Sequence, residues 1–377
     1  MQALKESNKV EVFYLGFNNL AFSSKNLFVR LISLGSIVFN VKSFFKTYKV
    51  VRINKIDIVH THNFFYMASP SVFWAIKLAR AKVVQTIHNY RIFCLAGTFF
   101  YNGKVCQDCI YSNIYKSGIK RACFKNSYFA SAILAFSNFF NKLIGTWNNK
   151  IDAYLVLTPF VKEIFCQSNF KIDSNKIIVR PNHGANIGFI PITERDNFFL
   201  YIGRISEEKG IFEMLNYWAN RKEPLIIAGT GESVQEEKLK KLIQGFPESK
   251  IQFIGKQDAH QVANLLKKCK ALIFPSIWFE GMPMILLEAM STGAMILMKE
   301  NSNLKSLIVD KYNGLVYSNK NHFNKVLDEI AIFESPNLYI SIQRQAYHDY
   351  EANYAIKNAA ASLEKIYENL IKIESSD

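Results

Sequence analysis

The stretch Phe274-Pro275-Ser276-Ile277-Trp278-Phe279-Glu280-Gly281-Met282-Pro283, which continues to Glu288, says most about the fold. The apolar run 271–274 is typical of a buried strand, and it ends in a loop that presents the carboxylate of Glu280. We expect Pro283 at the first helical position, where its missing N–H costs nothing. A loop followed by a helix N-terminus can bind an anion. Two carboxylates beside such a site suggest a ligand with phosphate and hydroxyl groups, although acids also favour helix starts for their own sake.

Ten short apolar runs alternate with helical patterns along the chain. Most are continuous β-branched or aromatic runs, which are typical of parallel strands covered on both faces by helices. Repeated β-α units predict doubly wound sheets, and ten strands suit two sheets better than one. The expected fold class is therefore α/β, with two Rossmann-like domains. The runs are 10–15, 56–62, 82–88, 153–157, 176–180, 198–203, 224–229, 251–255, 271–274 and 294–298.

The length allows two domains, and the uneven net charge of the two halves suggests that they have different tasks. The 377 residues suffice for two domains, with a net charge of +15. Residues 1–185 hold 24 Lys and Arg against seven Asp and Glu, whereas the remainder holds 22 against 24. The basic half would suit an anionic membrane, a lipid-linked pyrophosphate or nucleic acid, unless it serves only solubility. Within it, the segment 25–49 is either a basic amphipathic helix on lipid or a core-facing helix.

The sequence contains no membrane span or secretion signal of the usual kind. Its longest candidate span, 31–41, is an uncharged run of 11 residues, well short of the roughly 20 that a helix needs to cross a bilayer. The first residues lack an apolar signal core. We therefore expect a cytoplasmic protein, peripheral on the inner face of the membrane.

Two glycine-containing turns supply cations and close backbone approach. Gly203-Arg204 and Lys209 join a strand to a helix, so that a guanidinium and an ammonium could neutralise a diphosphate. Gly229-Thr-Gly231 is a second such turn, weak as a motif by itself. No Asp-x-Asp pair occurs anywhere in the sequence, so the two cations would have to do the work that a metal does elsewhere. The alternative is a pair of solvated surface turns.

Polar residues also follow the strands of the first half. His62 and Asn63 follow one predicted strand and His88 ends the next, at the edge where α/β sheets bind ligands. His88 could orient a sugar hydroxyl, although a single strand-end histidine is more often structural.

Four of the six cysteines cluster in the sequence, two of them at the C-x2-C spacing of a zinc half-site. A reducing cytoplasm disfavours disulfides, so the choice lies between a structural zinc bound by all four thiolates and free thiols in a loop. The four are Cys94, Cys106, Cys109 and Cys123.

In this order, the motifs resemble the family-4 retaining glycosyltransferases of the GT-B fold over residues 10 to 370. The resemblance implies two Rossmann-like domains facing across a cleft, at 1–185 and 186–350, joined near 183–196. A C-terminal helix, 351–377, returns to the first. The matching segments are Asp57-Ile-Val-His-Thr-His62-Asn63, Thr86-Ile-His88-Asn-Tyr90, Asp152-Ala-Tyr-Leu-Val-Leu-Thr-Pro159, Val179-Arg-Pro-Asn182, Tyr201-Ile-Gly-Arg204, Lys209-Gly210, Ala228-Gly-Thr-Gly231, Phe274-Pro-Ser276, Glu280, Glu288 and Asn313-Gly314-Leu315-Val316.

The resemblance also implies roles. Glu280 would contact hydroxyls of the donor sugar, and Glu288 the ribose; Arg204 and Lys209 would bind the diphosphate. His88 would lie near the reacting carbon, with front-face attack and no metal required. Backbone of the donor site would come from Gly203, Gly229, Gly231, Gly281, Met282, Pro283 and Met284, and the acceptor side would include His62 and Asn63.

Two departures from the family pattern stand out. The usual first strand, Gly-Gly loop and helix are absent before 10–15, and Ser306 replaces a frequent Glu. The expected function is transfer of a sugar from a UDP- or GDP-sugar to a glycan or lipid-linked glycan of surface polysaccharide or lipopolysaccharide. The rivals are a sugar-nucleotide epimerase of the same fold, an inactive scaffold and a nucleic-acid binder, the last disfavoured because Glu280 and Glu288 would repel phosphates.

Overall fold

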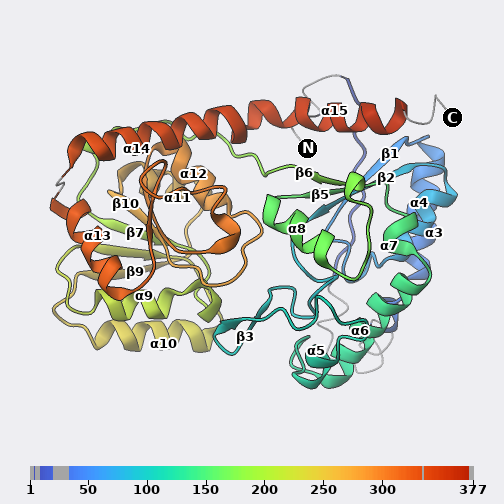
Figure 1. The fold of residues 1–377 in the computed structure, drawn as a ribbon, viewed down its shortest axis with the longest axis horizontal. Helices are drawn as coiled ribbons and strands as arrows, with labels where there is room; N and C mark the ends of the chain where they lie inside the picture. Colours follow the sequence, from blue (N-terminus) through green and yellow to red (C-terminus); the bar gives the residue numbers. More distant parts are fainter. Residues whose placement is uncertain (1–3, 5–8, 20–33, 333–334, 373–377) are drawn as a thin grey trace. The chain divides into compact units, whose positions relative to one another are not determined.

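The computed structural model describes residues 4, 9–19, 34–332 and 335–372, and Figure 1 shows their helices and strands. The chain divides into two units. The first comprises residues 1–99, 106–181 and 360–377, and the second comprises 100–105 and 182–359. The boundaries expected from the sequence were 185/186 and 350/351, whereas the second unit of this division runs from 182 to 359 and includes 100–105.

The first unit is built on a four-stranded parallel sheet in the order β1-β2-β5-β6. The centre of one face consists of Val84, Ala153 and Leu155. The helix α15 (Ala359–Lys372) covers this face with Leu363, Ile366, Tyr367 and Leu370, so the end of the chain completes the core of its beginning. The strands are β1 (Ile58–His62), β2 (Lys82–Ile87), β5 (Ala153–Val156) and β6 (Ile177–Val179).

Side-chain caps mark where several helices of this unit begin. Asn40, Ser127 and Thr158 each accept a hydrogen bond from a first-turn N–H of α3, α6 and α8 respectively, which satisfies a donor that the helix itself cannot. The helices are α3 (Val41–Ile53), α4 (Ser71–Leu78), α5 (Lys116–Lys120), α6 (Tyr128–Leu143), α7 (Thr146–Asn149) and α8 (Pro159–Gln167). A short hairpin, β3 (Phe100–Tyr101) and β4 (Lys104–Val105), is grouped with the second unit.

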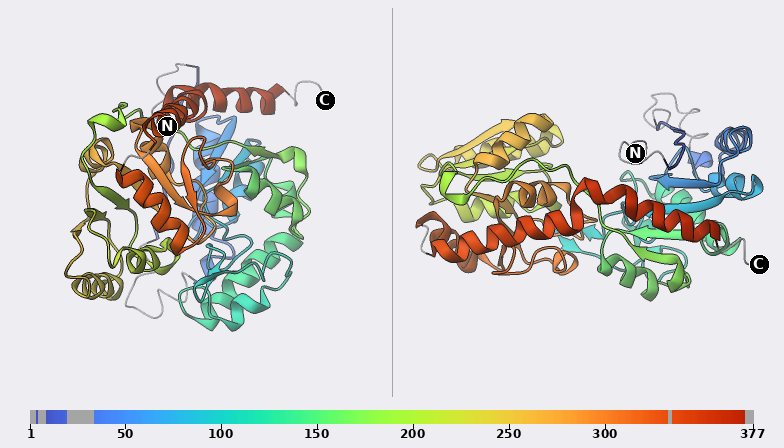
Figure 2. Two further views of the ribbon diagram at one scale, coloured as in Figure 1. Left: turned by 60° about the vertical axis from the view of Figure 1, so that its left-hand side comes forward. Right: turned by 90° about the horizontal axis from the view of Figure 1, so that it is seen from above.

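The second unit contains a six-stranded parallel sheet in the order β12-β11-β10-β7-β8-β9, and helices lie on both of its faces (Figures 1 and 2). The strand order reverses between β7 and β10, and open α/β sheets bind ligands at the carboxyl ends of strands at such a switch point. The strands are β7 (Phe199–Ile202), β8 (Leu225–Ala228), β9 (Ile251–Gly255), β10 (Ala271–Phe274), β11 (Met295–Lys299) and β12 (Leu315–Tyr317).

Helices of the second unit follow the strands in β-α alternation. They are α9 (Ile211–Trp218), α10 (Ser233–Gln244), α11 (Ala259–Lys268), α12 (Met284–Thr292), α13 (Lys320–Ile332) and α14 (Pro336–Asp349). No helix in the described part of the chain is long and apolar enough to cross a membrane.

Three expectations from the sequence were wrong. The run 10–15 is not a strand: no neighbour pairs with it among the described residues, and Phe13 and Tyr14 are exposed. A β-forming run needs a partner for its backbone groups. The C-terminal helix expected from 351 begins only at Ala359, because Ala355 is extended and pairs with Gly184. Pro283 caps α12 from outside the helix, which begins at Met284.

The turn that contains Gly229 lies so close to the turn that contains Gly203 that a side chain at Gly229 should be costly. Its φ is +146°, and a Cβ there would lie 1.8 Å from the carbonyl oxygen of Gly203. The neighbouring Gly255 has φ +67° with open space around it. Gly255→Ala should therefore cost only the left-handed strain of about 1–2 kcal/mol, whereas Gly229→Ala should add about 1–3 kcal/mol for the clash. Urea unfolding of both variants measures the difference, and equal losses would contradict the close approach.

Candidate active site

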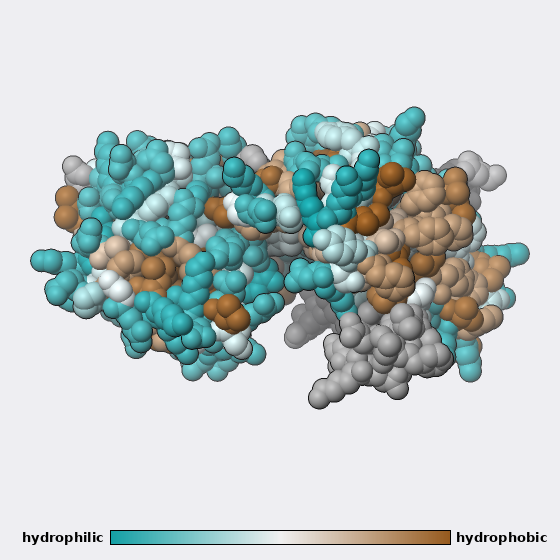
Figure 3. Space-filling model, turned by 90° about the horizontal axis from the view of Figure 1, so that it is seen from below, coloured by the Kyte–Doolittle hydropathy of each residue, from teal (hydrophilic) through white to brown (hydrophobic). Residues whose placement is uncertain are grey.

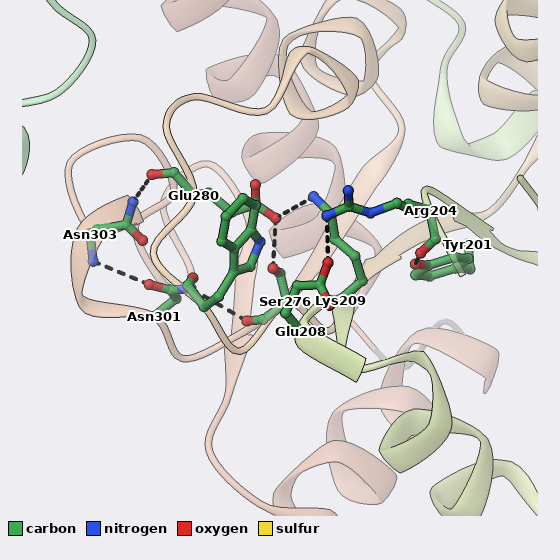
Figure 4. Close-up of polar contacts among 9 residues, drawn as sticks. Tyr201, Arg204, Glu208, Lys209, Ser276, Glu280, Asn301 and Asn303 are labelled. Carbon is green, nitrogen blue, oxygen red and sulfur yellow. Dashed lines mark hydrogen bonds and ion pairs between the residues drawn. The ribbon is translucent and has the colours of Figure 1, made fainter. Parts of the chain in front are cut away.

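Glu280 is fixed at the carboxyl end of β10 by three hydrogen bonds (Figure 4). The residue is only 4% exposed. Its Oε1 accepts from Lys209 Nζ at 2.7 Å and from Ser276 Oγ at 2.6 Å. Its main-chain oxygen accepts from Asn303 Nδ2. A buried carboxylate is stable only when it is paired and hydrogen-bonded, and both conditions are met here.

Lys209 brings its charge to Glu280 from the other side of the switch point. It ends a 3-10 turn, Glu207–Lys209, that follows β7, and its ammonium lies 5.2 Å from the ring centroid of Trp278. The two loops touch through backbone: Ile277 N donates to Glu208 O at 3.1 Å. A Cβ on Gly210 would lie 2.0 Å from the oxygen of Pro275. Loop contact and ion pair therefore define one site.

Arg204 is the more accessible of the two cations. Its side chain is 55% exposed and pairs with Glu208, one turn further along the chain. Its backbone oxygen accepts a hydrogen bond of 2.8 Å from the hydroxyl of Tyr201. Burial, followed by the charge of Glu280, raises the pKa of Tyr201, so this hydroxyl stays protonated as a donor. The guanidinium thus stands on a fixed backbone with donors still open to solvent.

The turn with Gly229 and Gly231 lies beside the Arg204 loop. Ile205 and Gly231 form a parallel bridge, and a Cβ on Gly231 would lie 2.3 Å from the oxygen of Ile205. Gly203 N donates to Ala228 O at 3.1 Å. The N–H of Gly231 donates to Glu236 at 2.9 Å. The glycines therefore serve the approach of the two loops, and the amide of Gly231 is already in use.

The helix α12 places Glu288 in its second turn. Asn182 holds the segment that leads into α12. Its backbone N donates to Met282 Sδ at 3.1 Å, and its Nδ2 donates to Met282 O at 3.2 Å. Gly281 and Met284 flank this entry. Burial raises the pKa of the half-buried Glu288, as expected for a carboxylate shielded from water.

In the first unit, three histidines stack at the carboxyl ends of β1 and β2. His62 Nδ1 lies 2.8 Å from His88 Nε2, with ring centroids 5.1 Å apart. The ring of His60 stacks on His62 at 4.3 Å. Two bonds of 2.6 Å anchor His60, one to the hydroxyl of Thr86 and one to that of Tyr367 on α15. Beyond them, Asn89 Nδ2 donates to Asn63 Oδ1 at 3.2 Å.

The histidine cluster is neutral at physiological pH. Burial, together with the charges of nearby histidines and Arg180, lowers the pKa of His60 to about 2 and that of His62 to about 4. Burial also lowers the pKa of His88. In the bond between His62 and His88 one nitrogen must donate and the other accept, so the tautomer of each ring determines that of the other.

Comparisons with known proteins agree with this arrangement. The Glycosyl transferases group 1 family matches residues 185–349, and Glycosyltransferase Family 4 matches residues 2–183. The chain belongs to the family-4 glycosyltransferases. Its fold is GT-B, with two Rossmann-like units. A glycosyltransferase of Rickettsia africae has a TM-score of 0.66 and 19% identity over 98% of this chain and 87% of its own.

Two curated relatives are more informative about the family than about this chain's substrate. An uncharacterized glycosyltransferase of Methanocaldococcus jannaschii is 25% identical over 62% of this chain and 63% of its own. The match thus spans slightly less than two thirds of that relative. The Escherichia coli UDP-Gal:alpha-D-GlcNAc-diphosphoundecaprenol alpha-1,3-galactosyltransferase is 23% identical over 74% of this chain and 67% of its own.

Several residues of the candidate site were missed from the sequence. Ser276 and Trp278 stand within the motif that drew attention to Glu280, and the four-residue spacing from Ser276 was a usable signal. The sequence held no signal for Asn303 or Tyr367, because each contacts its partner, Glu280 or His60, from an element that is distant along the chain.

The four clustered cysteines are free thiols in the structure. Burial, together with the charges of Cys94, Cys123 and Cys106, raises the pKa of Cys109 to about 12, so the four lie near one another. Arg121 Nη1 donates to Cys106 Sγ at 3.1 Å. Across the described ranges, however, no group of three or more His, Cys, Asp or Glu is arranged to hold a metal ion. Protonated thiols pack as small apolar groups.

The structural zinc therefore stays a prediction. If the four cysteines bind zinc together, they form a donor set that zinc prefers, and the purified protein holds about one zinc per chain. Plasma emission analysis measures it, and Cys109→Ser should lower the zinc content where Cys166→Ser, at an exposed cysteine outside the cluster, does not. Protein without stoichiometric zinc or iron would contradict the prediction.

The lowered pKa of His60 predicts acid sensitivity. Unfolded His60 takes up a proton below about pH 6.5, whereas folded His60 stays neutral down to about pH 2. Acidification below pH 6.5 should therefore favour unfolding, by at most about 1.4 kcal/mol per pH unit for one proton. His60→Asn should flatten the slope of unfolding free energy against pH between 6.5 and 4.5. His260→Asn, at an exposed site on α11, is the control, and parallel slopes for all three proteins would refute the assignment.

Proposed function

We propose that this protein is a retaining glycosyltransferase that moves a sugar from a nucleotide-sugar to a hydroxyl of a glycan or lipid-linked glycan acceptor. The product would belong to cell-surface polysaccharide or lipopolysaccharide. The observation that carries the proposal is the Lys209–Glu280 pair at the switch point of the second sheet. A cation and a carboxylate held side by side match a ligand that carries phosphate next to sugar hydroxyls.

The donor would bind through residues of the second unit. Lys209 and the exposed guanidinium of Arg204 would bind the diphosphate, Glu280 would accept from hydroxyls of the sugar, and Glu288 would bind the ribose. Because a phosphate would compete with Glu280 for Lys209, donor binding would free carboxylate lone pairs for the sugar. The two cations would stabilise the charge that develops on the leaving diphosphate, and catalysis would need no metal. The UDP-galactose in the name of the Escherichia coli relative supports a UDP-sugar.

The chemistry would follow a front-face course. The acceptor oxygen bonds to the anomeric carbon as the bond to the leaving phosphate breaks, and the acceptor's proton passes to a phosphate oxygen. Retention then requires no enzymatic nucleophile. His88 would interact with the sugar as a neutral imidazole, in keeping with its lowered pKa and its bond to His62. His62 and Asn63 would lie toward the acceptor.

The acceptor would be presented at an anionic membrane surface, with the protein bound peripherally from the cytoplasmic side. The excess of 24 basic over seven acidic residues in 1–185 supports this location. So does the diphosphoundecaprenol, a lipid, in the name of the Escherichia coli relative. A sugar-nucleotide epimerase of the same fold would convert its substrate without an acceptor, and an inactive scaffold would bind nucleotide without turnover, so product analysis separates the three.

Glu280→Ala is the sharpest test. We expect transfer to fall at least about 100-fold, because the sugar loses the group that positions it, while UDP still raises the melting temperature by mass action. Glu300→Ala, at an exposed carboxylate paired with Lys305, is the matched control and should leave both unchanged. Radiolabelled sugar transfer and thermal shift supply the two readouts. Full turnover in Glu280→Ala would remove this residue from the mechanism.

A further inference from the structure

The helix α6 exposes large apolar side chains. Its buried side mixes Leu134 and two alanines with four polar residues that are at most 2% exposed, Ser131, Ser137, Asn138 and Asn141. Its outer side carries Phe129, Phe136 and Leu143, at 60%, 55% and 72% exposure. Ile133 and Phe140 fill the intervening positions, half-buried. The outer stripe follows the 3.6-residue period of a helix face, so the larger apolar side chains of α6 point away from the core.

Specific hydrogen bonds hold the helix in this orientation. Ser137 Oγ donates to Ile37 O at 3.0 Å, and Asn138 Nδ2 donates to Arg91 O at 3.0 Å. Ser131 Oγ accepts from Phe124 N at 2.9 Å. Rotating α6 to bury its aromatic side would break these bonds and leave buried backbone groups without partners, which is costly. The exposure of the aromatic side is therefore a stable feature of the fold.

The surroundings of the stripe are strongly basic. From residue 109 to residue 151 the chain holds six Lys and Arg and no Asp or Glu. Lys116 and Lys120 lie on α5, and Lys125 lies between α5 and α6; all three are exposed. Figure 3, which views the molecule from the side where α5 and α6 lie in Figure 1, shows brown apolar surface gathered over the first unit.

We propose that the outer face of α6, defined as Phe129, Ile133, Phe136, Phe140 and Leu143, inserts into the interface of an anionic lipid bilayer, with the α5 lysines on the headgroups. The proposal rests on the membrane location inferred above and names the surface responsible. An aromatic and aliphatic face next to lysines is the composition of helices that lie in a bilayer interface. A zone with this excess of basic residues, in which Asp108 pairs with Arg121 at 2.7 Å, is attracted to an anionic leaflet and would repel a second copy of itself.

The segment 25–49 keeps both of its sequence-based interpretations. Residues 25–33 of that segment lie outside the described residues. The helix α3 that follows buries Ser43, Thr47 and Val51 against its own unit, and it leaves Phe45 and Ile53 exposed at 62% and 66%. The assignment to α6 therefore rests on the contacts of α6 itself.

Vesicle co-sedimentation of the full chain without substrates tests the surface. Wild type should bind vesicles of phosphatidylcholine with one quarter phosphatidylglycerol at least ten times better than phosphatidylcholine alone. The triple variant F129S/F136S/L143S should lose at least tenfold of this binding, and K116Q/K120Q/K125Q should lose the preference for anionic lipid. V234S/Y312S/I332S, which alters exposed apolar residues of the second unit, is the matched control and should bind as wild type does.

Three results would overturn the proposal: wild type that ignores both vesicles, an α6 variant that binds as wild type does, or a wild-type dimer that the α6 variant converts to monomer. Circular dichroism and the UDP thermal shift show that each variant is folded. Transfer to a water-soluble acceptor should be unchanged in the α6 variant and reduced only for an acceptor embedded in vesicles. Wild type inactive on every acceptor would instead count against the proposed function, because lipid binding is measured without turnover.

Discussion

The arrangement of the second unit depends on the ion pair between Lys209 and Glu280. It joins the loops that follow β7 and β10, at the point where the strand order reverses. Removing two charges from water costs more than a single contact between them returns, so a buried pair of this kind is weak evidence for stability. Ser276 and Asn303 offset part of that cost by adding donors to the side chain and main chain of Glu280. The pair is better understood as a binding site in which the protein's own groups satisfy one another.

The glycines make this pairing geometrically possible. A side chain at Gly210 would collide with Pro275, and one at Gly229 would collide with Gly203. Because glycine has no side chain, the loops that follow the strands can approach until their backbones touch. Residues from different β-α units therefore share one site. The backbone contacts therefore fix where the two loops lie, and the ion pair and the bond from Ser276 orient the charges that the loops carry. Groups fixed in this way would suit the sugar and diphosphate of the proposed donor.

The sequence predicted the parts of this arrangement that depend on local pattern. Nine of the ten apolar runs contain a strand, because continuous β-branched stretches between helices admit few other structures. Glu280, Lys209 and Arg204 were recognisable since each follows a strand. The failures concern partners. The run 10–15 has strand composition but no partner strand in the described part of the chain, and β12 is only three residues long. Tyr367 meets His60 across 307 positions of the chain, which no local signal could indicate.

The first unit also brings polar side chains together near its strand ends, but these side chains are uncharged. The second unit pairs the buried carboxylate of Glu280 with the ammonium of Lys209. The first unit instead stacks three neutral imidazole rings, and burial keeps them neutral by lowering the pKa of His60, His62 and His88. The anchor at the base of the stack is Tyr367 on α15, a helix that also covers the sheet core. Core packing and the anchoring of His60 are thereby tied to one element. Loosening α15 would free the ring on which His62, the hydrogen-bond partner of His88, is stacked, so the C-terminal helix supports the histidine cluster as well as the core.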